Sequence, residues 1–287
     1  MPLDSIAEIL ASCSERNLAF WQVVLEADVE ERQVSAGASF EKMRATWRAM
    51  LDSAESYDGG LRSVSGLSGG DGELMLRYAA GGAALGGGYI SEVIATALCV
   101  GESNACMRKI VAAPTAGACG VLPAVLVPLY RRGEREEDIL RALYTAAGIG
   151  AVINSRASIS GAAGGCQAEI GSASAMAAGA LAQLRGGGPE QTANALAMAL
   201  KNLIGLICDP VAGLVEVPCV KRNVIGAVNA VSCADMALAG ITSRIPADEV
   251  IDCMGIVGER LPREFRETAR GGLAATPTGR AAWKQLK

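Results

Sequence analysis

The stretch EREEDILRALYTAAGIGAVI (residues 134–153) indicates the fold class of this chain. Four of its first five residues are acidic, as suits a helix N-terminus, where the helix dipole favours negative charge. Helical periodicity, with apolar residues three to four positions apart, also marks 3–13 and 40–53. Residues 189–206 and 246–261 each begin with proline, which is favoured in the first helical turn. We therefore expect a mainly α protein, built as a compact all-helical domain.

The composition bounds the organisation of this domain. The 287 residues suffice for one large domain or two small ones. Apolar residues make up 51% of the chain, aromatic residues only 4%, and there are 35 glycines, so helices can pack with their backbones close together. Only 211–220 resembles a strand. The Gly/Ser-rich stretch YDGGLRSVSGLSGGDG (57–72) is the best candidate for an internal boundary or else a surface loop, dividing an N-terminal helical segment (1–56) from a larger part (57–287). We expect both parts to form one continuous globular unit.

Charge and residue usage exclude several function classes. The net charge is −4, with basic residues spread among acidic ones, which argues against a nucleic-acid surface. The chain has no histidine, so it contains neither a Ser–His–Asp triad nor a histidine zinc site. Any base must be another side chain or come from elsewhere.

The sequence predicts neither a membrane span nor an export signal. Residues 110–130 are long and apolar enough to span a bilayer, but they contain three prolines and two glycines, and such irregular backbone cannot face lipid. A buried core segment explains them better. The first residues carry acids where a signal peptide carries basic residues. Nine cysteines, an odd number, are too few for a disulfide scaffold, so we expect reduced thiols and a cytoplasmic location.

Three cysteines stand on backbone that is free to curve around a metal cluster. Cys166 follows two glycines and precedes a predicted helix start, where a thiol pKa is lowered. Cys208 ends a predicted helix and is followed by Asp-Pro, and Cys219 follows a proline. Their separations of 42 and 11 residues match none of the common ferredoxin motifs, so buried structural thiols remain the alternative. On composition alone Cys119, in the turn GACG, is equally suitable. The remaining cysteines lie in helical patterns and are expected to be small core residues: Cys13, Cys99, Cys106, Cys233 and Cys253.

Four segments resemble the α chain of iron–sulfur L-serine dehydratase. They are VAAPTAGACGVLPAVL (111–126), NSRASISGAAGGCQAEIGSASAMAAG (154–179), CDPVAGLVEVPCVKRN (208–223) and RETARGGLAATPTG (266–279). The resemblance covers roughly residues 60 to 280. It implies that Cys166, Cys208 and Cys219, carried by Gly-rich loops, bind a 4Fe-4S cluster with one open iron. It assigns no ligand role to the cysteine at position 119.

The resemblance also implies a partner. Single-chain members carry a histidine-containing N-terminal domain, which two-chain members place on a separate β chain. Single-chain relatives have Glu-His-Asn ahead of the CDPVAG cysteine, whereas this chain has Lys201-Asn202-Leu203, as in the two-chain branch. We therefore expect a hetero-oligomer with a β chain that supplies the base, and we assign no base to this chain. Some relatives end in a cysteine that folds into the site; the ending AWKQLK predicts no such plug here.

The expected reaction is the conversion of L-serine to pyruvate and ammonia. An open iron acts as a Lewis acid on the leaving hydroxyl while a base takes the α-proton. Arg156 is a candidate for binding carboxylate or balancing the cluster's charge, and Glu169 for contacting the substrate ammonium or capping its helix. For Lys221 and Arg222, a pair of solvated surface charges explains the sequence as well as any specific role in the site. Candidate donors to the substrate carboxylate are Thr115, Asn154, Ser158 and Ser160.

Three other interpretations remain open. A pyridoxal-phosphate dehydratase would need a Schiff-base lysine near a phosphate-binding loop, and no lysine is paired with the glycines at 86–88. A related cluster enzyme would act on L-threonine or L-cysteine. A helical scaffold without a cofactor would use its thiols only to fill the core.

Overall fold

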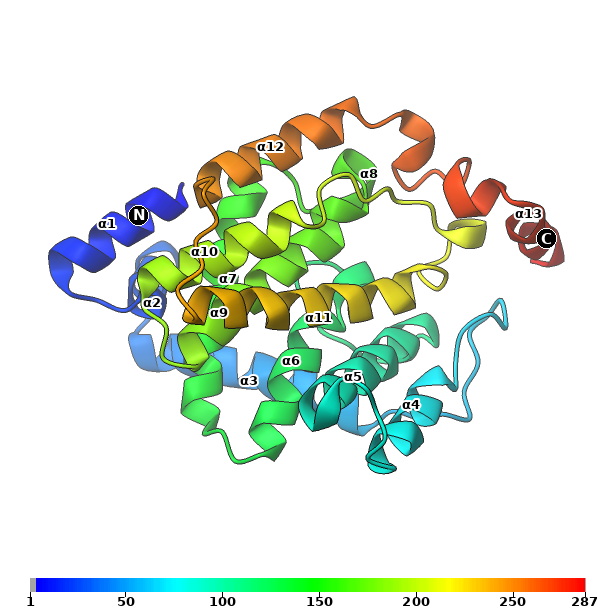
Figure 1. Ribbon diagram of the computed structural model, residues 1–287, viewed down its shortest axis with the longest axis horizontal. Coiled ribbons are helices and arrows are strands. Elements are labelled where there is room, and N and C mark those ends of the chain that lie inside the picture. The colour runs from blue at the N-terminus through cyan, green and yellow to red at the C-terminus, as the bar shows by residue number, and fades with distance from the viewer. Residues whose placement is uncertain (1–3, 287) are drawn as a thin grey trace.

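The computed structural model describes residues 4–286, which form thirteen α-helices joined by turns and short 3-10 segments (Figure 1). Within this part of the chain there is no β-strand, only one isolated parallel bridge between Cys208 and Arg266. The predicted all-helical fold is confirmed. The helices are α1 (Ile6–Arg16), α2 (Phe20–Arg32), α3 (Ala36–Glu55), α4 (Asp71–Ala80), α5 (Gly87–Ala105), α6 (Val121–Arg131), α7 (Glu136–Arg156), α8 (Gly161–Gly164), α9 (Ser172–Leu184), α10 (Pro189–Lys201), α11 (Cys219–Leu238), α12 (Ala247–Arg260) and α13 (Pro277–Gln285).

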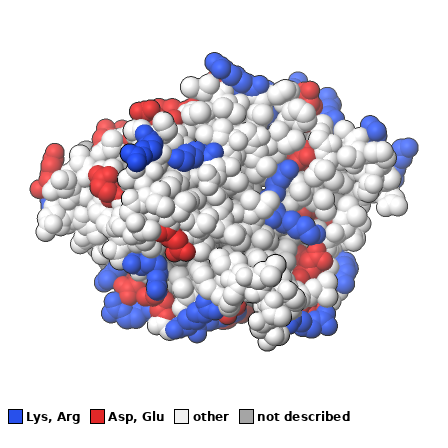
Figure 2. Space-filling view, viewed as in Figure 1, with Lys and Arg blue, Asp and Glu red and all other residues white. Residues whose placement is uncertain are grey.

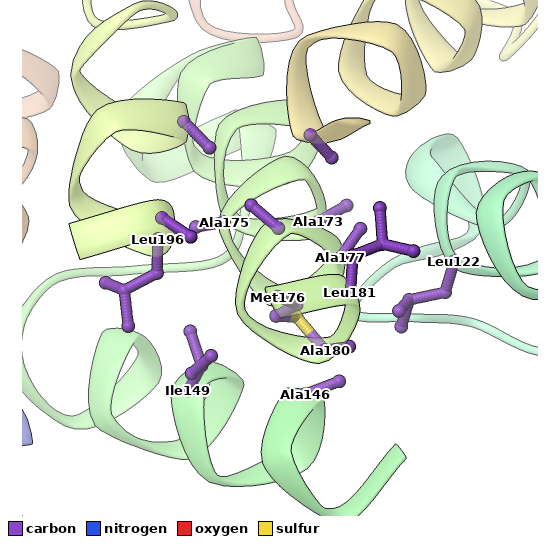
Figure 3. Close-up of a cluster of buried hydrophobic side chains, with 14 of the residues drawn as sticks. Leu122, Ala146, Ile149, Ala173, Ala175, Met176, Ala177, Ala180, Leu181 and Leu196 are labelled. Carbon is purple, nitrogen blue, oxygen red and sulfur yellow. The ribbon is translucent and has the colours of Figure 1, made fainter. Parts of the chain in front are cut away.

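Helix α9 forms the centre of the molecule. All its residues from Ser172 to Ala182 are buried, and most of them are alanine, glycine or serine. These small side chains let α7, α10 and α11 approach α9 closely. Figure 3 shows Ala173, Ala177 and Leu181 of α9 among side chains from the surrounding helices. A core built from small residues, as the composition predicted, therefore surrounds one helix.

The N-terminal helices cover one side of this core. Helices α2 and α3 pack on α7, and the fully buried Trp47 of α3 meets the Tyr130 ring edge-on. Helices α1 and α3 correspond to the predicted helices at 3–13 and 40–53, and the predicted start at Leu3 lies outside the described residues. Helix α2 lies outside the predicted helices.

Two predicted elements end or form differently in the structure. Helix α10 ends at Lys201 rather than near 206, because the chain turns and passes through Gly205 with a φ of 89°. Residues 211–220 are not a strand: they form a 3-10 turn at Val211–Gly213 in which Ala212 has a φ of 57°, and α11 then begins at Cys219. Cys208 therefore lies in an extended connection and does not end a helix.

The apolar segment at 110–130 is part of the core. It forms a 3-10 turn followed by α6, whose residues from Val121 to Pro128 are all buried. None of the helices between residues 4 and 286 is long and apolar enough to cross a membrane. Figure 2 shows basic and acidic side chains interspersed over the face in view, without a large patch of one sign.

Candidate functional site

Three cysteines from separate segments lie in one buried region. Cys166 precedes the π-helical turn Gln167–Gly171 that leads into α9, Cys208 lies in the connection after α10, and Cys219 is the first residue of α11. The three are 2%, 3% and 8% exposed. Burial raises the pKa of Cys208, and the charges of Cys166, Glu169 and Cys219 raise it further. The thiols therefore lie close enough to influence one another's ionisation.

Backbone contacts bring Cys208 next to Cys166. Gly165 has a φ of 77°, and a Cβ at this position would lie 3.0 Å from the carbonyl oxygen of Leu206. Because no side chain is there, the Gln167 amide can donate to that same oxygen at 2.9 Å, while the Gln167 side chain accepts from the Gly205 amide at 2.8 Å. The glycine before the first thiol thus permits the second thiol's segment to pass beside it.

The C-terminal segment holds Cys208 from its other side. The Cys208 amide donates to the carbonyl oxygen of Phe265 at 2.8 Å, and the Glu267 amide donates to the Cys208 carbonyl oxygen at 3.0 Å. The motif at 266–279 therefore lies beside the motif at 208–223, although more than forty residues separate them in the sequence.

An arginine beside the thiols is buried with an aspartate. Arg222 is 12% exposed, and its Nη2 lies 2.9 Å from Oδ1 of Asp209, which is 2% exposed. Its Nη1 donates to the Ile207 carbonyl oxygen at 2.8 Å, and Asp209 Oδ2 accepts from the Leu273 amide at 2.8 Å. Burial raises the pKa of Cys166 to about 11, while the positive charge of Arg222 acts in the opposite direction. The guanidinium of Arg222 therefore lies close enough to the Cys166 thiol to favour its thiolate form.

The interpretation of Lys221 and Arg222 as a solvated pair fits Lys221 but is wrong for Arg222. Lys221 is exposed and its Nζ lies 2.8 Å from Asp71 Oδ2, whereas Arg222 faces the interior. A signal in the sequence was available: Arg222 follows Cys219 by three positions, so the two share a face of α11.

Glu169 faces the same buried region. Its Oε1 accepts from Thr115 Oγ1 at 2.8 Å, and its Oε2 lies 3.9 Å from Cys208 Sγ, which donates to it. Burial raises the pKa of this carboxyl above its ordinary value. A Cβ at Gly161 would lie 2.6 Å from Glu169 Oε2 and 3.1 Å from Cys208 Sγ, so the glycine leaves room for both groups. Of the predicted substrate-binding residues, Thr115 is thus placed beside the thiols.

The other three predicted substrate-binding residues lie on the chain leading to Cys166. Asn154 is exposed in the last turn of α7, and Ser158 Oγ accepts from the Ser160 amide at 3.1 Å. Ser160 directly precedes Gly161. Across residues 4–286 none of the three hydrogen-bonds to the thiols or to Glu169, so their roles stay predictions.

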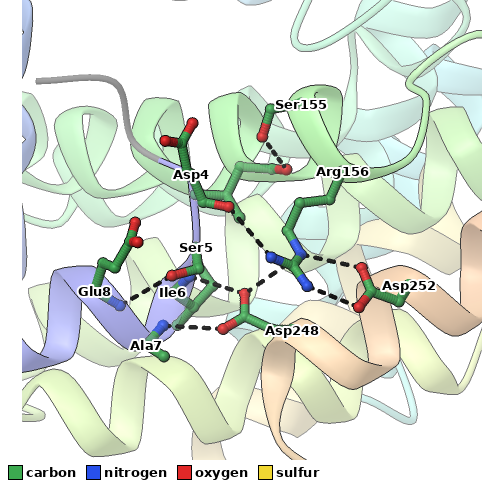
Figure 4. A network of polar contacts seen from close by, with 10 residues as sticks. Asp4, Ser5, Ile6, Ala7, Glu8, Ser155, Arg156, Asp248 and Asp252 are labelled. Atoms are coloured by element: carbon green, nitrogen blue, oxygen red, sulfur yellow. Dashed lines mark hydrogen bonds and ion pairs between the residues drawn. The ribbon is translucent and has the colours of Figure 1, made fainter.

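Arg156 was considered for binding the substrate carboxylate or balancing the cluster's charge, but the structure gives it a different role. Its Nε and Nη2 donate to Asp252 at 3.0 and 2.7 Å, and its Nη1 donates to the Asp4 carbonyl oxygen at 3.4 Å. Asp248 lies 3.9 Å from its Nε and also accepts from the amides of Ile6 and Ala7. Figure 4 shows this network, which joins α7 to α12 and to the first turn of α1. The guanidinium is engaged there and not with the cysteines.

The other six cysteines have different surroundings. Cys119 is 1% exposed, its Sγ faces the Val100 carbonyl oxygen at 3.9 Å, and burial raises its pKa to about 12. Cys13, Cys99 and Cys233 are buried in helices, as predicted, but Cys106 is half-buried and Cys253 is exposed. Cys253 is therefore not a core residue. All nine cysteines are free thiols.

A single metal ion and an iron–sulfur cluster require different arrangements of their protein ligands. Within residues 4–286, no three His, Cys, Asp or Glu side chains converge closely enough to hold a single metal ion. A 4Fe-4S cluster requires a different arrangement, because each cysteine binds a different iron and the ligands are therefore spaced around the cluster. Three buried thiols, two of them at helix starts and one beside a buried arginine, fit an anionic group of that kind.

Comparisons with known proteins show the family to which this chain belongs. A family model described as serine dehydratase alpha chain matches residues 15–274. The chain is 46% identical over 283 residues to the probable L-serine dehydratase, alpha chain, of Bacillus subtilis, covering 98% of this chain and 94% of the relative. It is 39% identical over 283 residues to the L-serine dehydratase, alpha chain, of Peptoniphilus asaccharolyticus, covering 96% of each. It is 48% identical over 181 residues to the L-serine dehydratase TdcG of Escherichia coli, covering 62% of this chain and 40% of that enzyme. With a family match across most of the chain and relatives aligned along nearly all of it, this chain belongs to the serine dehydratase alpha chain family.

Proposed function

We propose that this chain is the cluster-bearing α subunit of an iron–sulfur L-serine dehydratase, which converts L-serine to pyruvate and ammonia. The observation that carries the proposal is the meeting of Cys166, Cys208 and Cys219 in one buried region, in a chain of the serine dehydratase family.

The three cysteines would hold a 4Fe-4S cluster. When bound with one iron free of protein ligands, such a cluster supplies a Lewis acid for the substrate hydroxyl. Arg222 lies where its charge offsets that of the Cys166 thiolate, and Asp209 holds the guanidinium in place. The glycine at 161 leaves room for Cys208 and Glu169, and the glycine at 165 lets the Leu206 backbone pass beside the segment of Cys166.

Glu169 and Thr115 would position the substrate. The carboxylate of Glu169 lies beside Cys208, and Thr115 fixes its orientation by donating to Oε1. A buried carboxylate in this place suits the ammonium group of an amino acid, since an opposite charge compensates for its burial. Asn154, Ser158 and Ser160 remain our candidates for donors to the substrate carboxylate, together with backbone amides of the glycine turns.

A separate β chain would complete the enzyme. The chain contains no histidine, and the longer Escherichia coli relative has more than half of its length outside the aligned region. We infer a hetero-oligomer in which the β chain supplies the base for the α-proton. Nine free thiols also suit the reducing conditions of the cytoplasm.

The test combines iron and acid-labile sulfide analysis with a serine-to-pyruvate assay, both anaerobic and with and without the β chain. Cys166→Ser, Cys208→Ser and Cys219→Ser should each lose the cluster and turnover. Cys119→Ser and Cys233→Ser, also buried, should keep both. Wild-type iron content in the first three variants, or equal loss in all five, would refute the ligand set. Rates on L-threonine and L-cysteine define the substrate class.

A further inference from the structure

Arg266 is half-buried, and its side chain has no polar partner among residues 4–286. Four arginines of this part of the chain are not exposed, and the other three, Arg44, Arg141 and Arg222, form ion pairs with carboxylates. The Nε of Arg266 is buried without a hydrogen bond. A charged group loses hydration on burial, and a compensating partner normally accompanies it. Arg266 is therefore the buried cation of the described chain that is suited to an external anion.

Arg266 lies opposite Cys208. The two residues form the parallel bridge, in which the Cys208 amide donates to the Phe265 carbonyl oxygen at 2.8 Å and the Glu267 amide donates to the Cys208 carbonyl oxygen at 3.0 Å. Side chains of directly paired residues leave the backbone on the same face. The Arg266 side chain thus begins on the face that carries the Cys208 thiol, whose Sγ lies 3.9 Å from Glu169 Oε2. A basic and an acidic side chain therefore belong to one face of the candidate site.

The backbone after Arg266 has an uncommon conformation. Glu267 and Ala269 have φ angles of 61° and 54°, in the left-handed region that residues other than glycine rarely adopt. Residues held in this way concentrate at binding and catalytic sites, where the surrounding contacts impose the conformation. A Cβ at Gly272 would collide with the Asp209 carboxylate, so this segment is in direct contact with the connection between α10 and α11. The backbone that carries the arginine is thus fixed before a ligand arrives, which lowers the entropic cost of binding.

We propose that Arg266 binds the carboxylate group of the substrate, an inference that rests on the proposed function. A guanidinium can form two parallel hydrogen bonds to a carboxylate, which fixes its orientation as well as adding affinity. The substrate is a free α-amino acid with one positive and one negative charge. Glu169 receives its ammonium group and Arg266 its carboxylate, so that each charge meets an opposite one in the buried site. Arg266 adds a charged donor to the neutral candidates Asn154, Ser158 and Ser160.

The test uses the enzyme assembled anaerobically from the holo α chain and the β chain. Equilibrium dialysis measures binding of radiolabelled L-alanine, which has both charges of the substrate but no hydroxyl group to lose, and of L-alaninamide, which lacks the carboxylate. In Arg266→Met the dissociation constant of L-alanine and the KM for L-serine should rise at least about thirtyfold, as for truncation of one member of a buried charge pair. The dissociation constant of L-alaninamide, the iron content and the helical circular dichroism should not change.

Two further variants accompany this test. Arg263→Met is the matched control, because it removes the same charge from an exposed position of the same segment, and it should match the wild type in every measurement. Arg266→Lys keeps the charge but not the planar pair of donors, so its affinity for L-alanine should lie between those of the wild type and Arg266→Met. If Arg266→Met does not fold, the lysine variant decides the question by the same comparison of L-alanine with L-alaninamide.

Three results would overturn this proposal alone. Unchanged binding of L-alanine by Arg266→Met, with turnover intact, would place the carboxylate elsewhere and leave the proposed function standing. Loss of iron from Arg266→Met before substrate is added, with full iron in Arg263→Met, would show that Arg266 balances the charge of the cluster. An equal loss of affinity for L-alanine and L-alaninamide would exclude recognition of the carboxylate. A wild-type enzyme that holds no iron and does not convert L-serine would instead refute the proposed function, and this inference with it.

Discussion

Arg222 connects separate segments of the site through buried polar contacts. Its guanidinium joins the carboxylate of Asp209 to the Ile207 carbonyl oxygen, and Asp209 in turn accepts from the Leu273 amide. Three chain segments therefore meet at one ion pair. A buried pair of this kind contributes little compared with two apolar residues, but removing one member leaves an unpaired buried charge.

We expect Arg222→Met to lower the free energy of unfolding of the apo chain by about 3–5 kcal/mol, because Asp209 would stay buried without its partner. The measurement is urea denaturation followed by circular dichroism. Lys221→Met is the control, since its ion pair with Asp71 is exposed and should change the stability by less than about 1 kcal/mol. Equal effects of the two substitutions would contradict the burial of the Arg222–Asp209 pair.

At this scale the sequence predicted part of the site. The resemblance singled out Cys166, Cys208 and Cys219, and the structure brings them together, while the Cys119 thiol faces the Val100 carbonyl oxygen. Composition alone could not distinguish Cys119 from the three candidate ligands, because a Gly-rich turn does not indicate which thiols the fold brings together. Arg156 was considered as a candidate for the site because of its position in the motif, yet its hydrogen-bond partner Asp252 is more than ninety residues away in the sequence.

Helix contacts are set by glycines at the points of closest approach. Gly120 precedes α6, and a Cβ there would lie 2.8 Å from the Ala97 carbonyl oxygen of α5 and 3.1 Å from Asn223 Oδ1 of α11. The Gly120 amide donates to that same Asn223 oxygen at 2.8 Å. Because a neighbouring backbone atom limits the space, an added methyl group cannot be accommodated by a rotamer change alone.

We expect Gly120→Ala to destabilise the chain by about 1–3 kcal/mol through this overpacking. Gly37→Ala in the first turn of α3 should instead stabilise it by up to about 1 kcal/mol, since the nearest atom to its Cβ is 3.9 Å away and alanine favours a helix. Denaturant midpoints of both variants check the two signs. A neutral Gly120→Ala variant would show that α5 and α6 are free to separate.

Periodic helices were predictable from sequence, and irregular backbone was not. Helix α7 corresponds closely to the stretch at 134–153, because its acidic first turn and regular apolar spacing are local signals. The end of α10 and the turn at 211–213 depend on positive φ angles at Gly205 and Ala212. Ala212 has no local signal for this conformation; the turn exists because the surrounding contacts impose it.

For the whole molecule, the site depends on contacts between distant segments. Cys208 is held by the backbone of Phe265 and Glu267, and its neighbour Asp209 by Leu273. No periodicity in the sequence predicts which segments pair in this way. The resemblance to a family named the motifs at 208–223 and 266–279 separately, and only the fold shows that they are one structural unit.

This arrangement predicts that loading the cluster stabilises the whole chain, because ligands before α9, in the α10–α11 connection and at the start of α11 would be tied together. A ligand at a hundredfold excess over its dissociation constant adds about 2.7 kcal/mol. At about 2–4 °C per kcal/mol for a chain of this size, anaerobic reconstitution should raise Tm by about 5 °C or more. Scanning calorimetry of the apo and reconstituted chain measures the shift. The Cys166→Ser/Cys208→Ser/Cys219→Ser variant, treated identically, should show none, and Cys119→Ser should show the full increase. An equal rise in the triple variant would mean that iron binds elsewhere, since removing all three thiols would then have left the binding group untouched.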